Sequence, residues 1–187
     1  IKVSCDVYFY QISREIGINK IAEVCKRFGL GKQVFIKFIE EINVLVPNKS
    51  WKKETLGTSW MVGETLSAGI GQGYFLATAA QLSLALAQLV NGGKKIEPLI
   101  VYRNKISPKN DEINLASKRH IQIVQKALDD ATNAINGTSY GSRVTGKYKM
   151  GGKTGTSQVR VISSKEREDG IIKNKDLPWE MREHGLF

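Results

Sequence analysis

The stretch Met150-Gly151-Gly152-Lys153-Thr154-Gly155-Thr156 is followed directly by the run Ser157-Gln158-Val159-Arg160-Val161-Ile162. Alternation of apolar and polar residues in this run predicts a half-buried β-strand, with the Lys-Thr-Gly-Thr tetrad along its rim. A strand edge can hydrogen-bond an extended peptide through its backbone, while an ammonium and two hydroxyls can bind a carboxylate. Gly155 lets a peptide backbone approach closely because it has no Cβ. The tetrad therefore predicts a peptide-binding edge, although a Lys-[Ser/Thr]-Gly triplet alone arises by chance in roughly one chain in ten of this length.

A second motif lies at the start of the chain, where Ser4-Cys5-Asp6 opens an apolar, aromatic run. Ser-x-Asp resembles the Ser-x-Asn element that accompanies Lys-Thr-Gly in penicillin-recognising enzymes. Between the two motifs lie the glycine-rich segment 69–78 and a helical pattern that ends at residues 89–94. The order and spacing of these segments resemble the transpeptidase domain of class B penicillin-binding proteins, most closely the elongation-type subfamily, penicillin-binding protein 2. The resemblance runs over nearly the whole chain.

The resemblance implies an α+β fold of the β-lactamase/transpeptidase type, in which helices pack on an antiparallel sheet. The residues themselves predict helices from the spacing of apolar positions and from capping residues. These helices are expected at residues 7–16, 20–28, 79–90 and 117–135. The turn-rich segment 43–73 predicts an extended connection over the site. In the third helix, the spacing predicts a buried stripe of Leu82, Ala85, Leu86 and Leu89.

Such domains carry a Ser-x-x-Lys motif, whose serine is the nucleophile, upstream of Ser-x-Asn. Only three residues precede Ser4 in this chain. Ser50-x-x-Lys53 has the right spacing, but it follows Pro47 in a basic, polar stretch, so we predict a loop there. We expect residues 1–187 to be a partial transpeptidase domain that lacks the nucleophile-bearing part and the last strands. By itself this fragment is expected to be inactive and mainly helical, with any membrane anchor outside it.

The resemblance also implies roles for individual residues. Three are expected to be catalytic: Ser4, Asp6 and Lys153. Three are expected to bind substrate: Thr154, Gly155 and Thr156. Ser4 would relay a proton toward the leaving amine, while Lys153 would hold its hydroxyl and keep the site positive. Asp6 stands where asparagine is more usual, and an ionised aspartate accepts hydrogen bonds without donating any. The alternative role for Asp6 is a helix cap, and both roles can coexist.

Cys5 raises the question of a metal. In some elongation-type relatives the cysteine of Ser-Cys-Asp is one ligand of a zinc ion, with aspartates and a histidine upstream, and such a ligand set suits zinc. We therefore predict Cys5 as a possible ligand of a structural zinc in the intact protein. No cofactor is expected to be required for catalysis.

The formal net charge of +10 raises nucleic-acid binding as an alternative. Aromatic residues make up 8% of the chain and are not interleaved with the basic clusters, and no nucleic-acid-binding motif is present. We therefore exclude nucleic acid as a partner and expect a solvated cationic surface.

The resemblance implies a peptidoglycan D,D-transpeptidase that cross-links stem peptides during cell-wall elongation and is a target of β-lactam antibiotics. Scaffold proteins of cell elongation are the expected partners, and the periplasmic face of the bacterial inner membrane is the expected location. Two alternatives stay open: a D,D-carboxypeptidase or β-lactamase of the same superfamily, and a non-catalytic interaction domain.

Overall fold

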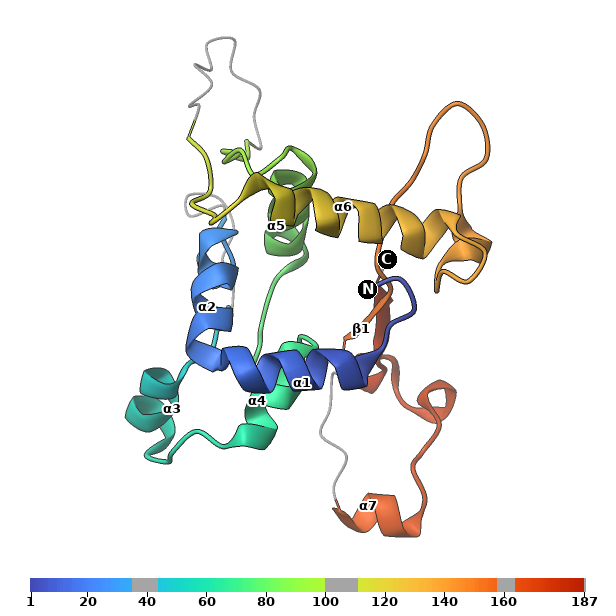
Figure 1. Ribbon diagram of the computed structural model, residues 1–187. Coiled ribbons are helices and arrows are strands. Elements are labelled where there is room, and N and C mark those ends of the chain that lie inside the picture. Colours follow the sequence, from blue (N-terminus) through green and yellow to red (C-terminus); the bar gives the residue numbers. More distant parts are fainter. Residues whose placement is uncertain (35–43, 100–110, 158–163, 187) are drawn as a thin grey trace. The chain divides into compact units, whose positions relative to one another are not determined.

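The computed structural model describes residues 1–34, 44–99, 111–157 and 164–186, and it divides into two compact units. One unit contains residues 1–4 and 127–187, and the other contains residues 5–126 (Figure 1). We call them the site unit and the helical unit. Among the described residues, no helix is long and apolar enough to span a membrane.

The helical unit is built from short helices, and those near residues 7–16, 20–28, 79–90 and 117–135 are predicted from the sequence. Its first two helices are α1, Asp6–Ile16, and α2, Ile18–Arg27. Gly17 separates them at φ 77°, a conformation that costs glycine little, and its N–H donates to Ser13 O at 2.8 Å. α5, Ala79–Val90, begins at the predicted capping box, in which Thr78 and Gln81 exchange side-chain-to-backbone hydrogen bonds. α6, Lys118–Asn133, starts in this unit and ends in the site unit.

The predicted extended connection over residues 43–73 is wrong. This segment contains two helices, α3, Lys49–Leu56, and α4, Val62–Gly69. Asn48 caps α3 by accepting a hydrogen bond from Trp51 N at 2.8 Å, and Gly57 ends it in the left-handed conformation. Ser50 and Lys53 therefore lie one turn apart on a helix, not in the loop that the sequence predicted.

α1 and α4 pack closely against each other, and this contact requires a glycine at residue 69. A Cβ built on Gly69 would lie 1.7 Å from Ser13 Oγ and 3.4 Å from Phe9 O. Ser13 is 3% exposed, and its hydroxyl donates to Phe9 O within α1, so it cannot turn toward solvent. The two helices can approach this closely only because residue 69 is glycine.

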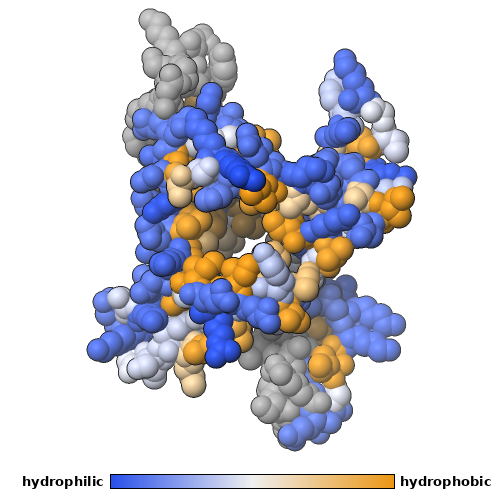
Figure 2. Space-filling model, in the orientation of Figure 1, coloured by the Kyte–Doolittle hydropathy of each residue, from blue (hydrophilic) through white to orange (hydrophobic). Residues whose placement is uncertain are grey.

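The buried face of α5 differs from the predicted leucine stripe. Leu82 and Leu86 are 42% and 47% exposed, whereas Gln81 and Gln88 are buried. The side-chain amides of the two glutamines are satisfied by backbone carbonyls, because Gln81 donates to Lys32 O and Gln88 donates to Phe28 O. Apolar side chains also reach the surface along α1, where Val7 is 64% exposed (Figure 2).

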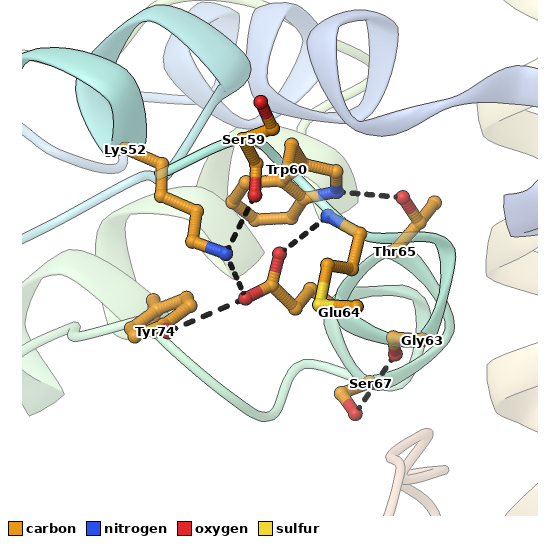
Figure 3. Close-up of polar contacts among 9 residues, drawn as sticks. Lys52, Ser59, Trp60, Gly63, Glu64, Thr65, Ser67 and Tyr74 are labelled. Atoms are coloured by element: carbon orange, nitrogen blue, oxygen red, sulfur yellow. Dashed lines mark hydrogen bonds and ion pairs between the residues drawn. The ribbon is translucent and has the colours of Figure 1, made fainter. Parts of the chain in front are cut away.

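An ion pair between the buried Lys52 and the half-buried Glu64 joins α3 to α4 (Figure 3). The ammonium of Lys52 donates to Glu64 Oε1 and, at 2.9 Å, to Ser59 O. Glu64 Oε2 accepts from Met61 N at 2.7 Å, and the ring of Tyr74 packs between Trp51 and Trp60. The Lys52 side chain is only 6% exposed, so loss of Glu64 would leave a buried charge without a partner. The pair therefore stabilises the turn between the two helices.

The site unit contains a short antiparallel sheet. β1, Gly155–Ser157, pairs with β2, His184–Leu186, with Thr156 opposite Gly185. Between them lie α7, Ser164–Asp169, and two single 3-10 turns, Asn174–Asp176 and Trp179–Met181. Most of the alternating run that follows β1 lies outside the described residues.

The α1–α4 crossing predicts that Gly69→Ala destabilises the protein by about 1–3 kcal/mol, because the added methyl overpacks a buried contact. Gly63→Ala is the matched control, since it lies in the same helix and a Cβ there would meet nothing within 4 Å. The midpoint of urea unfolding, followed by circular dichroism, measures the effect. Equal midpoints for the two variants would contradict the close crossing.

The Lys52–Glu64 pair predicts a pH dependence. Desolvation alone would raise the pKa of Glu64, but hydrogen bonds from Lys52 and Met61 N–H outweigh it and hold the pKa below its usual value of 4.5. The stabilisation is therefore fully present above about pH 4.5 and is lost as the pH falls through the lowered folded-state pKa. Protection factors of the amides in α3 and α4, which correct for the intrinsic slowing of exchange in acid, should therefore fall as the natural protein is acidified.

Glu64→Gln should abolish that acid dependence, and it should lower the protection of the α3 and α4 amides from hydrogen exchange at neutral pH. Glu112→Gln is the control, because Glu112 pairs with Lys118 on the surface, where both side chains are largely exposed and screened. An acid profile that Glu64→Gln leaves unchanged would rule out this carboxyl as its source.

Candidate functional site

The last turns of α6 hold the segment that leads into β1. Asn133 Nδ2 donates to Met150 O at 2.9 Å, and Gly152 N donates to Leu128 O at 3.2 Å. A Cβ on Gly151 would be 3.4 Å from Asp129 N, so the segment lies directly against the helix backbone. Lys153 and the strand that follows it therefore start from a fixed point.

The same helix end holds the start of the chain. Ser139 N donates to Ala131 O at 3.0 Å, which folds the loop after α6 back onto the helix. In the same loop, Thr138 N donates to Lys2 O at 3.1 Å. Residues 1–4 are therefore hydrogen-bonded to the loop after α6, and that loop is hydrogen-bonded to α6. Ser4 and Lys153, at opposite ends of the sequence, are both anchored through this helix within one unit.

Ser4 lies in an unusual conformation. Its φ is 48°, and among the residues that the structure describes no other residue besides glycine has a positive φ. Its N–H donates to Ile1 O at 3.2 Å, which closes a tight turn. Its Oγ is buried and has no hydrogen-bond partner among the described residues. Backbone strain and an unpaired hydroxyl each cost free energy, and both features cluster at functional sites.

Lys153 lies immediately before β1. Its ammonium donates to Thr154 O at 2.7 Å and to Thr154 Oγ1 at 3.2 Å. Among the described residues, no hydrogen bond joins Lys153 to Ser4. The structure therefore brings Ser4 and Lys153 into one unit, while their convergence across a shared groove stays a prediction.

The tetrad residues that are predicted to bind substrate are exposed to solvent. Thr154, Gly155 and Thr156 are all exposed. Gly155 and Thr156 lie in β1, whereas Thr154 precedes it. A cation, two hydroxyls and strand backbone are together along one short segment, an arrangement that can bind a carboxylate and pair with an extended peptide.

Cys5 and Asp6 open α1 in the helical unit, and the prediction of Asp6 as the helix cap is wrong. Cys5 occupies the N-cap position without a side-chain cap hydrogen bond, and Asp6 is the first helical residue. The Asp6 carboxylate still lies in the first turn, where it complements the helix dipole. Its proposed catalytic role stays a prediction.

The described residues supply fewer than three zinc ligands near Cys5. Cys5 is exposed and free, and the described part of the chain holds no group of three side chains that could bind a metal. A structural zinc ion normally needs four ligands. The described residues therefore do not form a zinc site by themselves, and Cys5 as a ligand stays a prediction for a longer protein.

Sequence reasoning missed Asn133 and Ser139. The side chain of Asn133 bridges α6 to Met150, and Ser139 is 3% exposed with an unpaired hydroxyl. The available signal was the Asn-Ala-Ile-Asn-Gly run at the helix end, where amide side chains often bind nearby backbone.

The folding of this loop onto α6 predicts that Gly137→Ala disrupts the site unit. A Cβ at residue 137 would lie 2.3 Å from Ala131 O, and backbone atoms cannot move aside as a side chain can. The expected cost is about 1–3 kcal/mol. Hydrogen exchange at Thr138, Ser139 and Gly152 reports it. Gly141→Ala is the matched control, because its Cβ would meet nothing within 4 Å. Normal protection in Gly137→Ala would contradict the anchoring.

Comparison with known proteins identifies the family to which this chain belongs. The model of the penicillin-binding protein transpeptidase domain matches residues 1–171. The peptidoglycan D,D-transpeptidase MrdA of Salmonella typhimurium is 34% identical over 198 residues, covering 100% of this chain and 31% of that protein. MrdA of Haemophilus influenzae is 32% identical over 192 residues, covering 98% of this chain and 29% of its own length. The chain thus spans about a third of these relatives.

Solved structures agree with the sequence matches. Penicillin-binding protein 2 of Helicobacter pylori, in a complex with MreC, has a TM-score of 0.77 at 31% identity, covering 99% of this chain and 31% of that chain. Penicillin-binding protein 2 of Pseudomonas aeruginosa, in complex with WCK 5153, has a TM-score of 0.73 at 33% identity, covering 82% of this chain and 36% of that chain. The predicted transpeptidase-like fold is confirmed, and the chain belongs to the penicillin-binding protein transpeptidase domain family, with penicillin-binding protein 2 among its relatives.

Proposed function

We propose that this chain is part of a peptidoglycan D,D-transpeptidase that cross-links stem peptides during cell-wall elongation. One observation carries the proposal most directly. Ser4 and Lys153, the two residues that match the catalytic motifs of the family, are anchored in one unit by the end of α6. The strained conformation and buried hydroxyl of Ser4 support a functional role for that residue.

In the proposed reaction, a serine outside this chain attacks the carbonyl carbon of the penultimate D-alanine of a stem peptide. An ester bond forms, the peptide bond breaks, and terminal D-alanine leaves with a proton. Ser4 delivers that proton, with the positive charge of Lys153 beside it. An amine of a second stem then attacks the ester, and the serine recovers its proton as the cross-link forms.

The tetrad binds the stem in this proposal. The hydroxyls of Thr154 and Thr156 donate hydrogen bonds to the terminal carboxylate, and they donate in the same way to the carboxylate of a β-lactam. The N–H of Thr156 supplies one donor to the oxyanion, and the nucleophilic serine supplies the other. Gly155 lets the stem backbone lie against the strand.

Partners and location follow from the relatives. Because the solved complex from Helicobacter pylori joins penicillin-binding protein 2 to MreC, a scaffold protein of that kind is the proposed partner of the longer protein. A position on the periplasmic face of the inner membrane fits cell-wall synthesis. Cys5 is proposed as one ligand of a structural zinc only in that longer protein.

A fluorescent penicillin tests the function. The full-length protein should form a covalent, denaturation-resistant adduct, and residues 1–187 alone should form none. Lys153→Ala in the full-length protein should slow acylation by about a hundred- to a thousand-fold, since an electrostatic contact to the reacting group is lost. Lys173→Ala, which removes an exposed cation of the same unit, is the control.

Two results would count against the proposal. Absence of an adduct on the full-length protein would favour a non-catalytic interaction domain. An adduct that is hydrolysed within seconds, without cross-linking of added stems, would indicate a β-lactamase.

A further inference from the structure

A long acid-free stretch surrounds the tetrad. Between Asp130 and Glu166 the chain contains no aspartate or glutamate. The same stretch contains six basic residues: Arg143, Lys147, Lys149, Lys153, Arg160 and Lys165. The whole chain has 28 basic and 18 acidic residues, so the absence of acidic residues here is a local feature rather than a reflection of the average composition.

Three of these cations lie on one exposed loop. We call residues 141–149 the basic loop; all of them are exposed. The loop projects from the end of α6 and returns toward β1 (Figure 1), and it is largely hydrophilic in Figure 2. Its two ends are fixed on α6, one by Ser139 N and Ala131 O and the other by Asn133 and Met150 O. A fixed base holds the charged tip in a limited region of space.

Two of the three cations of the basic loop lie over aromatic rings, and none of the three is paired with a carboxylate among the described residues. The Arg143 guanidinium lies 3.9 Å from the ring centroid of Tyr140 and donates to Tyr140 O at 2.9 Å. The Lys147 ammonium lies 5.8 Å from the ring of Tyr148, which is 73% exposed. Within the described residues, no ion pair includes Arg143, Lys147 or Lys149. Their charge is therefore available to an external anion.

We propose that the basic loop is a second contact for the peptidoglycan strand, outside the tetrad, and that its cations bind carboxylates of the stem peptides. The inference rests on the proposed function. Lys149 is four residues from Lys153, at most about 14 Å along an extended chain. That separation is comparable to the Debye length of about 10 Å at 0.1 M salt. A polymer bound at β1 therefore carries its neighbouring carboxylates into the field of the loop.

The test compares the full-length protein with the variant Arg143→Gln/Lys147→Gln/Lys149→Gln. The matched control, Lys20→Gln/Lys26→Gln/Lys53→Gln, removes the same charge from exposed lysines of the helical unit. The probes are soluble peptidoglycan fragments, either untreated or with their carboxylates converted to amides. Binding is measured at low and high salt, and the fluorescent penicillin adduct is measured on each protein.

The untreated fragments should bind about tenfold more weakly to the loop variant than to the natural protein at low salt, because three screened surface contacts are lost. The difference should shrink at high salt and disappear with amidated fragments. The control should bind as the natural protein does, and all three proteins should form the penicillin adduct.

Equal binding by the loop variant and the natural protein, with the adduct intact, would overturn the loop proposal and leave the proposed function standing. Absence of the penicillin adduct on the natural full-length protein would instead refute the proposed transpeptidase function. The loop variant can also be tested on vesicles that contain anionic phosphatidylglycerol. A defect seen with vesicles and not with fragments would assign the loop to the membrane and would equally overturn the proposal.

Discussion

The site depends on hydrogen bonds that the end of α6 makes to two segments far apart in the sequence, through its backbone and the Asn133 side chain. Leu128 O and the Asn133 amide hold the chain before Lys153, and Ala131 O holds the loop on which residues 1–4 rest. Ala131 lies in the last turn of α6, where carbonyls have no partner within the helix, so its oxygen is free to accept from another segment. A helix end thereby becomes the common support for Ser4 and Lys153.

Much of the helical architecture could be predicted because its signals are local. The capping box of Thr78 and Gln81, the glycine after α1 and the apolar spacing of α6 each act within a few residues. The two motifs could be recognised for a similar reason, since each is a short run of defined chemistry. Their meaning came from their order along the chain, and no single motif would have identified the family.

The errors came from contacts between residues that are far apart or polar. Glycines and Pro47 suggested a loop over residues 43–73, but the Lys52–Glu64 pair and the aromatic packing on Tyr74 fold it into α3 and α4. In α5, hydrophobicity pointed to leucines, yet Gln81 and Gln88 are buried because they satisfy the carbonyls of Lys32 and Phe28. A pattern based on hydrophobicity cannot anticipate which backbone groups will need a partner.

Ser4 illustrates how a local cost can indicate function. A serine at positive φ is strained, and its buried, unpaired hydroxyl adds a desolvation penalty; each costs roughly 1–3 kcal/mol. Glycine or asparagine would adopt this backbone conformation more easily, and alanine would remove the buried hydroxyl. A typical domain is stable by only about 5–15 kcal/mol, so the two costs together are substantial. Serine is therefore neither the best residue for this backbone conformation nor the best for a buried position without a hydrogen-bond partner. The property that distinguishes it from these alternatives is a hydroxyl that can donate and accept a proton.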